Sequence, residues 1–188
     1  MQARMFDAVI IAEKNSVARA FARNVSDGGK YSVERLNRLP LYVFKRRGET
    51  WASFGVSGHL MDYDFAEEYN SWRRVDPRVL FSIEPIKVVR GGNYRYVKAL
   101  RQLAARSDYF ILALDADPEG ESIAFEVMNV IKRANPRARF RRAWVRRSKG
   151  KQERAHGPGR TPILSGAAAA AFAAGLYLSL IHISEPTR

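Results

Sequence analysis

Two short apolar segments, each followed at once by acidic residues, constrain the fold of this chain more than any other feature. The first is AVIIA at residues 8–12, and Glu13 follows it directly. The second is YFILAL at residues 109–114, and residues 115–119 (DADPE) follow it directly. Runs of this kind are typical of buried parallel strands, and ligands of open α/β sheets bind at the carboxyl ends of such strands. The sequence therefore predicts an α/β domain with an acidic site at one edge of its sheet.

The remaining segments alternate between helical and extended patterns. Val17, Phe21 and Val25 recur at helical spacing after Asn15 or Ser16, either of which is a good N-cap. The expected elements are strands at 8–12, 109–114 and 139–145, a hairpin over 41–57, and helices over about 15–26, over about 94–106 and from 119 or 121 onward. A polar, aromatic-rich loop is expected between the hairpin and the second helix. This order predicts an α/β fold class with a largely parallel central sheet flanked by helices.

The composition is that of one globular domain in a reducing compartment. The 188 residues are 46% hydrophobic, which is enough for a single core. The absence of cysteine excludes disulfides and thiolate zinc sites. The N-terminal segment MQARMFDAVIIAEK lacks the basic region and long apolar core of a secretion signal, so we expect an intracellular protein.

The net charge of +13 is concentrated in one segment. Twelve of the 32 Lys and Arg residues lie between positions 132 and 160, where Glu153 is the only acid, so residues 1–131 carry only about +2. We therefore give the net charge little weight as a sign of nucleic-acid binding.

The alternation of elements stops after Val145. A basic segment and an alanine-rich block follow, and residues 178–188 (LSLIHISEPTR) resemble, without mismatch, the translation of a transposase adaptor used in sequencing libraries. We expect a globular domain at 1–145, a frameshifted or disordered tail at 146–177, and translated adaptor at 178–188. Residues 163–183 approach the roughly 20 apolar residues of a membrane span, but the adaptor explains them better, and no membrane association is expected.

The acidic residues at the two strand ends predict a divalent metal site. Two carboxylates about 4 Å apart repel by roughly 4 kcal/mol at an effective dielectric of ~20, and a hard cation offsets this repulsion because it binds oxygen ligands. Other interpretations of Asp-x-Asp stay open, namely solvated loop acids, N-caps, haloacid-dehalogenase phosphatases and glycosyltransferases. The phosphatase pattern has Thr or Val where this chain has Glu119, and Glu13 on a separate strand makes the set more specific.

Three segments carry a resemblance to a known family. VIIAEKNSVARAFA at 9–22 resembles the first motif of the Toprim fold, and ALDADPEGESIAFEV at 113–127 resembles its second motif. VSGHLMDYDFAEEYNSWRRVDPRVLF at 56–81 resembles the segment between these motifs in topoisomerase III, which Toprim primases and nucleases lack. The chain thus resembles a type IA DNA topoisomerase of the archaeal or eukaryotic topoisomerase III type.

The resemblance implies a Toprim (Rossmann-like) fold over residues 6 to about 145 and a role for each motif residue. The metal would be Mg²⁺, and its ligands would be Glu13, Asp115, Asp117 and Glu119. The catalytic residues would be Glu13, Lys14 and His59. Glu13 would assist proton transfer at the scissile ester, Lys14 would contact the scissile phosphate, and His59 would shape the loop over the active site.

Two positions depart from the pattern of the family. The family usually has Pro where this chain has Asn15, a residue that also suits the start of a helix. It often has Arg or Lys where this chain has Pro118, which removes one possible phosphate contact but is compatible with a first helical turn.

The resemblance also implies an activity, which is Mg²⁺-dependent cleavage, strand passage and religation of single-stranded DNA or RNA by an isomerase. The tyrosine nucleophile would lie in a later domain, because no tyrosine here has the Pro-Arg-Thr-Glu type of context, so this fragment alone is expected to be inactive. The longer enzyme would have a helicase partner and would lie in the cytoplasmic nucleoid of a prokaryote or in a nucleus. The alternatives are a stand-alone Toprim primase or nuclease, and a non-catalytic nucleic-acid-binding protein that uses the basic tail.

Overall fold

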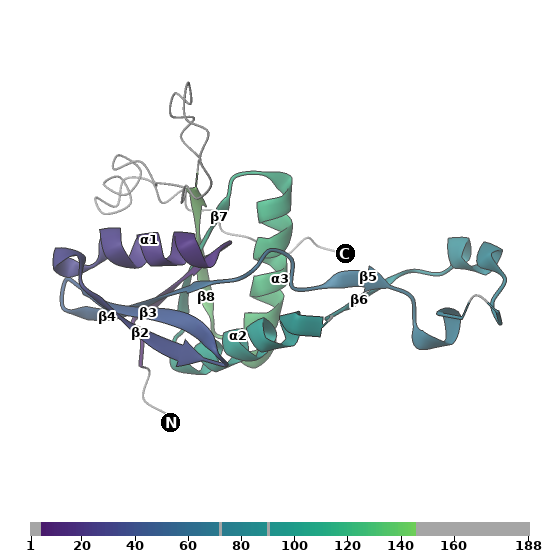
Figure 1. Cartoon of the computed structure of the whole chain (residues 1–188), viewed down its shortest axis with the longest axis horizontal. Helices are drawn as coiled ribbons and strands as arrows, with labels where there is room; N and C mark the ends of the chain where they lie inside the picture. The colour runs from purple at the N-terminus through teal and green to yellow at the C-terminus, as the bar shows by residue number, and fades with distance from the viewer. Residues whose placement is uncertain (1–4, 72, 90, 146–188) are drawn as a thin grey trace, which may run out of the picture.

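The computed structural model describes residues 5–71, 73–89 and 91–145 (Figure 1). The expected tail at 146–177 and the expected adaptor at 178–188 lie outside the described residues. No helix in the described part of the chain is both long enough and apolar enough to cross a membrane.

A six-stranded sheet with the strand order β2-β3-β4-β1-β7-β8 forms the centre of the domain. Its strands are β1 (Ala8–Ala12), β2 (Tyr31–Leu36), β3 (Leu39–Arg46), β4 (Glu49–Gly55), β7 (Tyr109–Asp115) and β8 (Arg139–Val145). The neighbours β4, β1, β7 and β8 run parallel, whereas β3 is antiparallel to both β2 and β4. The predicted α/β class with a largely parallel sheet is confirmed.

Helices cover both faces of this sheet (Figure 1). The α-helices are α1 (Asn15–Val25), α2 (Tyr94–Arg106) and α3 (Pro118–Ala134), and the short 3₁₀ turns are η1 (Asp27–Gly29), η2 (Glu67–Tyr69), η3 (Pro77–Ser82) and η4 (Gly91–Asn93). Alternate residues of β1 point to opposite faces. Val9 and Ile11 pack in the core with α2 and α3, while Ile10 and Ala12 pack in the core with α1. Burial on both faces explains why β1 is uniformly apolar.

The start of α1 differs from the prediction. Lys14 occupies the N-cap position and no side chain caps the helix, so the expectation of an Asn15 or Ser16 cap is wrong. The Asn15 side chain lies inside the first turn, where its Oδ1 accepts a hydrogen bond of 3.0 Å from the Tyr42 hydroxyl. A bond to β3 has therefore replaced local capping.

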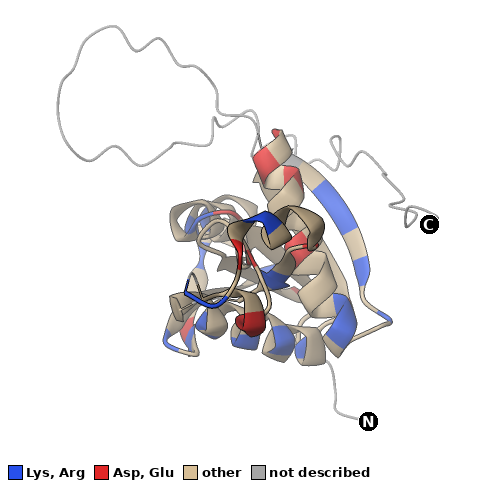
Figure 2. Ribbon diagram, turned by 90° about the vertical axis from the view of Figure 1, so that its right-hand side faces the viewer, with Lys and Arg blue, Asp and Glu red and all other residues tan. Residues whose placement is uncertain are grey.

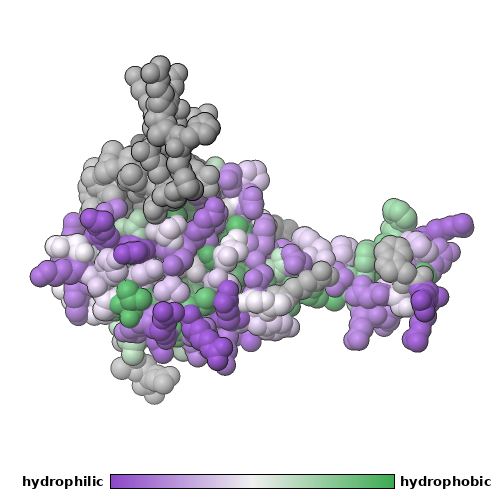
Figure 3. Space-filling view, viewed as in Figure 1, coloured by the Kyte–Doolittle hydropathy of each residue, from purple (hydrophilic) through white to green (hydrophobic). Residues whose placement is uncertain are grey.

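An arm projects from the compact part of the domain beyond α3 (Figures 1 and 3). Two three-residue strands, β5 (Asp62–Asp64) and β6 (Ile86–Val88), pair antiparallel at its base, and η2 and η3 lie between them. The sequence predicted this segment only as a loop. Its exposed apolar side chains include Phe81, which is 93% exposed, so the arm contributes little to the core.

Candidate functional site

The exits of β1 and β7 define the candidate site. These two strands are parallel neighbours, and Ala12 of β1 pairs with Ala113 of β7. Glu13 follows Ala12 by one residue and Asp115 follows Ala113 by two, so both acids leave the same edge of the sheet from strands about 4.8 Å apart. The topology thus brings together the backbones of the two predicted acidic motifs.

Two of the carboxylates at this edge, those of Glu13 and Asp117, form an ion pair or a hydrogen bond with other groups of the protein. Glu13, whose side chain is 17% exposed, has its Oε1 3.4 Å from Lys14 Nζ. Asp117 is the N-cap of α3, and its Oδ1 accepts a hydrogen bond of 2.7 Å from the Gly120 N–H. Within the ranges that the structure describes, no three His, Asp or Glu side chains are grouped closely enough to hold a metal ion. The expected convergence of carboxylates is therefore seen in the strand exits and not in the side-chain positions.

The acids at this edge form a donor set that suits a cation. Carboxylates that close around one point repel one another, and a bound cation offsets that repulsion. Two of the acids have a further contact, Asp117 with the Gly120 N–H and Glu13 with Lys14. Asp117 and Glu119 are exposed, and Asp115 is half-buried. The donors are all carboxylate oxygens on neighbouring segments, which suits a hard divalent cation.

Two helix N-termini lie at the same edge of the sheet. α1 begins directly after β1, and α3 begins directly after β7. The free N–H groups and the dipole of a helix N-terminus attract anions such as phosphate. Lys14, whose side chain is 52% exposed, adds a positive charge beside the first of these helices. One edge therefore combines groups that attract cations with groups that attract phosphates.

The structure places His59 at the root of the arm, in the segment that follows β4. Its Nδ1 lies 3.1 Å from Oε1 of Glu126, a residue of α3 that is only 3% exposed. Glu126 follows Glu119 by seven residues, which is two helical turns or about 10 Å along the axis. His59 thus contacts the middle of α3, and its catalytic role stays a prediction.

Glu126 is a structural residue that the sequence reasoning missed. Its Oε2 accepts hydrogen bonds from the backbone N–H groups of Leu60, at 2.8 Å, and Met61, at 3.3 Å. Lys87 Nζ, at the other end of the arm, lies 3.9 Å from its Oε1. The available signal was an acid within the apolar face of α3, between Ile123 and Val130. Glu126 therefore ties both ends of the arm to the helix that carries the acidic motif.

Arg142 of β8 was also missed, and it lies directly behind the acidic turn. It is 3% exposed, and its guanidinium binds the Glu121 carboxylate at 2.7 Å and the Asp115 carbonyl oxygen at 2.8 Å. The sequence interpretation treated this arginine only as part of a basic stretch. The available signal was an arginine within the expected strand at 139–145, since an arginine that a sheet buries must be paired with acceptors.

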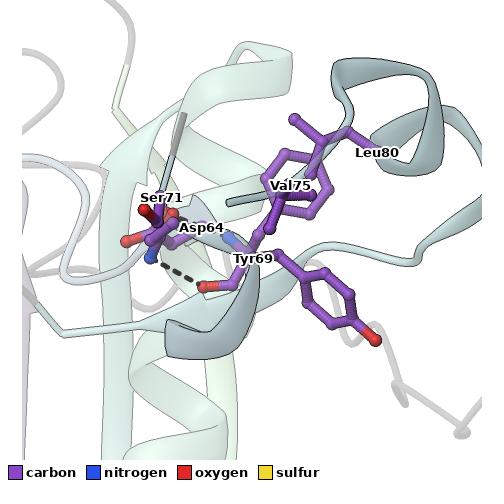
Figure 4. A pocket seen from close by; sticks show the side chains of 7 residues that line it. Asp64, Tyr69, Ser71, Val75 and Leu80 are labelled. Carbon is purple, nitrogen blue, oxygen red and sulfur yellow. Dashed lines mark hydrogen bonds between the residues drawn. The ribbon is translucent and has the colours of Figure 1, made fainter. Parts of the chain in front are cut away.

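A cavity of about 250 Å³ lies in the arm, away from the strand exits (Figure 4). It is lined by Asp64, Phe65, Tyr69, Asn70, Ser71, Val75 and Leu80. A hydrogen bond of 3.1 Å from Asn70 Nδ2 to the Phe65 carbonyl oxygen joins two of these lining residues. None of the predicted site residues lines this cavity, so it is separate from the candidate site.

Comparison with known proteins agrees with the topology. The profile of the Toprim domain family matches residues 8–147, which include both acidic motifs and every strand of the central sheet. The chain belongs to the Toprim family. This match confirms the predicted Toprim fold, and domains of this family bind divalent metal ions.

The relatives of this Toprim domain support the topoisomerase interpretation over the primase or nuclease alternative. It is 41% identical over 139 residues to DNA topoisomerase 3 of Dictyostelium discoideum, covering 71% of this chain and 17% of that protein. It is 35% identical over 138 residues to DNA topoisomerase 3-alpha of Arabidopsis thaliana, covering 71% and 15%. It is 36% identical over 129 residues to human DNA topoisomerase 3-beta-1, covering 65% and 15%. The chain therefore spans less than a fifth of the length of these relatives.

Proposed function

We propose that this Toprim domain supplies the Mg²⁺ site of a type IA topoisomerase that cuts and reseals a single DNA strand. The observation that carries the proposal is the exit of Glu13 and Asp115 from neighbouring parallel strands at one edge of the sheet. The similarity to proteins named DNA topoisomerase 3 supports it independently.

The metal ligands in this proposal are Glu13, Asp115, Asp117 and Glu119. A bound Mg²⁺ would neutralise charge on the scissile phosphate. Lys14 and the N-termini of α1 and α3 would hold that phosphate at the same edge of the sheet. These interactions require only the sugar-phosphate backbone, so they would bind single-stranded DNA with little dependence on base sequence.

The nucleophile in this proposal is a tyrosine of the longer protein. Its phenolic oxygen would attack phosphorus, the bond from phosphorus to the 3′-oxygen would break, and a 5′-phosphotyrosyl ester would form. The phenolic proton would pass to water, and the leaving 3′-oxygen would take up a proton from water with the assistance of Glu13. Resealing would reverse these steps after another strand has passed through the gap. The longer enzyme would work with a helicase that exposes single strands, in a nucleoid or a nucleus.

A metal titration tests the site directly. Mn²⁺ replaces Mg²⁺ in oxygen-donor sites and its free concentration can be followed by electron paramagnetic resonance, so it is the probe. The 188-residue chain should bind one Mn²⁺, which Mg²⁺ displaces, and Asp115→Asn should weaken binding at least about tenfold, since it removes a ligand charge. Asp62→Asn in the arm is the matched control and should bind like the parent. Equal affinity of the Asp115→Asn and parent proteins would refute the site.

A second experiment tests the activity of the longer protein. Expressed from the intact gene, it should relax negatively supercoiled plasmid with Mg²⁺, and Asp115→Asn within it should abolish relaxation. The 188-residue chain should relax nothing. A complete gene that encodes no tyrosine domain would contradict the topoisomerase proposal, and primer synthesis by the short chain would favour the primase alternative.

A further inference from the structure

The guanidinium of Arg142 is almost fully enclosed behind the acidic turn. Its Nη1 donates hydrogen bonds to the carbonyl oxygens of Leu112 and Leu114, both at 3.0 Å, and of Ala143, at 2.8 Å. Two of these acceptors belong to the last residues of β7. Arg142 therefore holds the carboxyl end of the strand that leads into Asp115.

The other side of the same guanidinium contacts the start of α3. Nη2 donates to the Asp115 carbonyl oxygen at 2.8 Å, and both Nε and Nη2 lie 2.7 Å from Glu121 Oε1. Arg142 thus contacts both ends of the segment 115–121, at Asp115 and at Glu121, and this segment includes three of the four acids assigned to the metal. Figure 2 shows acidic residues at the start of α3 and basic residues along the strand beside it.

All three guanidinium nitrogens of Arg142 are engaged by protein acceptors. An arginine has five N–H donors in a fixed plane, and here the acceptors are four backbone carbonyl oxygens and one carboxylate. Arg142 is only 3% exposed, so its guanidinium is not accessible to a phosphate group that approaches from solvent. Its contacts fix the backbone of the acidic turn.

We propose that Arg142 and Glu121 form a clamp that positions the Asp115–Asp117–Glu119 turn for metal binding. The inference rests on the proposed function, because it requires that these acids bind a divalent ion. Arg142 is a positioning residue in this scheme and touches neither metal nor DNA. Groups that orient metal ligands typically contribute about 10- to 100-fold to metal affinity.

The sign of the effect separates positioning from electrostatics. A buried positive charge near the site repels a divalent cation, so its removal alone would strengthen metal binding. Loss of positioning would weaken binding, because the ligands would occupy the binding geometry for less of the time. Substitution of Arg142 therefore gives opposite results under the two explanations.

The test is a Mn²⁺ titration of the full 188-residue chain carrying Arg142→Met. We expect affinity about 10- to 100-fold lower than in the parent. Arg141→Met is the matched control, because it removes the same charge from the same strand while its side chain lies on the opposite face of the sheet. Arg141→Met should bind at least as tightly as the parent. Unchanged or tighter binding by Arg142→Met would overturn the clamp.

A second variant keeps the test decisive if Arg142→Met does not fold. Glu121 is 42% exposed, and Glu121→Asp preserves its charge while shortening its reach to Arg142. We expect weaker Mn²⁺ binding and faster hydrogen exchange at the Gly120 amide, which bonds to Asp117. Parent-like values for both would overturn the clamp. Asp115→Asn, measured in parallel, distinguishes failure of the clamp from failure of the metal site. If Asp115→Asn binds Mn²⁺ like the parent, the metal site itself is refuted. If Asp115→Asn loses Mn²⁺ affinity while Glu121→Asp binds like the parent, only the clamp is refuted.

Discussion

Gly55 lies directly against the backbone of Asn15. A Cβ atom built on Gly55 would come 2.5 Å from the Asn15 nitrogen and 2.6 Å from its Cα, both closer than real Cβ contacts. Gly55 ends β4 and pairs with Ala12 of β1. The missing side chain therefore leaves room for the chain to turn from β1 through Glu13 into α1.

Substituting Gly55→Ala should destabilise the domain and disturb the turn at Glu13. Overpacking against fixed atoms costs typically about 1–3 kcal/mol, and here the obstructing atoms are backbone. The free energy of unfolding, measured by urea denaturation, should fall by this amount. Gly92→Ala is the control, because its Cβ would meet nothing within 4 Å, and it should stay within about 0.5 kcal/mol of the parent. Equal stability of both variants would contradict the close approach.

Gly120→Ala should weaken metal binding as well as folding. A Cβ at Gly120 would overlap the carbonyl oxygen of Asp115 and lie 3.0 Å from its carbonyl carbon. That oxygen also accepts the hydrogen bond from Arg142, so the turn cannot shift without losing this contact. We expect a loss of about 1–3 kcal/mol in unfolding free energy and reduced Mn²⁺ affinity in the folded protein. Parent-like Mn²⁺ affinity would show that the turn tolerates the shift.

The central sheet could be predicted because its inner strands are apolar on both faces. AVIIA is fully buried in β1, and YFILAL is buried in β7 except for the partly exposed Tyr109; burial on both faces produces these continuous apolar runs. β2 was not expected, because four of its six residues are exposed and its sequence YSVERL has no clear alternation. β5 and β6 have three residues each and are defined by their pairing at the root of the arm. Such tertiary pairing leaves little local signal.

The candidate site was predictable in its topology and less so in its side chains. The position of Glu13 and Asp115 at strand ends follows from the order of elements and the parallel connections. The contacts of Glu126 and Arg142 join residues that lie 21 to 67 positions apart in the chain, except for the bond of Arg142 with its neighbour Ala143. No local pattern encodes such partners, so only the signal of a charged residue in an apolar context was available.

Truncation of Phe81 and truncation of Leu60 should change the stability of the domain by very different amounts. Phe81→Ala should change the unfolding free energy by less than about 0.5 kcal/mol, because the side chain is 93% exposed at the arm. Leu60→Ala should cost about 2–5 kcal/mol, because Leu60 is 1% exposed in the main core. Urea denaturation of both variants gives the comparison. A loss above about 1 kcal/mol for Phe81→Ala would mean that the arm packs more tightly than its exposure indicates.

Glu126→Ala should detach the arm from α3 more than it unfolds the domain. The substitution removes the acceptor for the Leu60 and Met61 N–H groups, and an unsatisfied buried donor costs about 1–3 kcal/mol. It also removes the contacts of Glu126 with His59 and Lys87. We expect faster hydrogen exchange at the two amides and faster trypsin cleavage within the arm, whose base lies at these contacts.

Two further variants separate this anchoring from a general loss of stability. Glu126→Gln keeps one carbonyl oxygen, so it should retain most of the protection of the Leu60 amide. Asn129→Ala replaces an exposed residue of the same helix and should leave trypsin cleavage unchanged. Because the anchor lies two turns from Glu119, Mn²⁺ affinity should be affected less by Glu126→Ala than by Arg142→Met. If Glu126→Ala left arm cleavage at the parent rate, the buried carboxylate would not be what fixes the arm to α3.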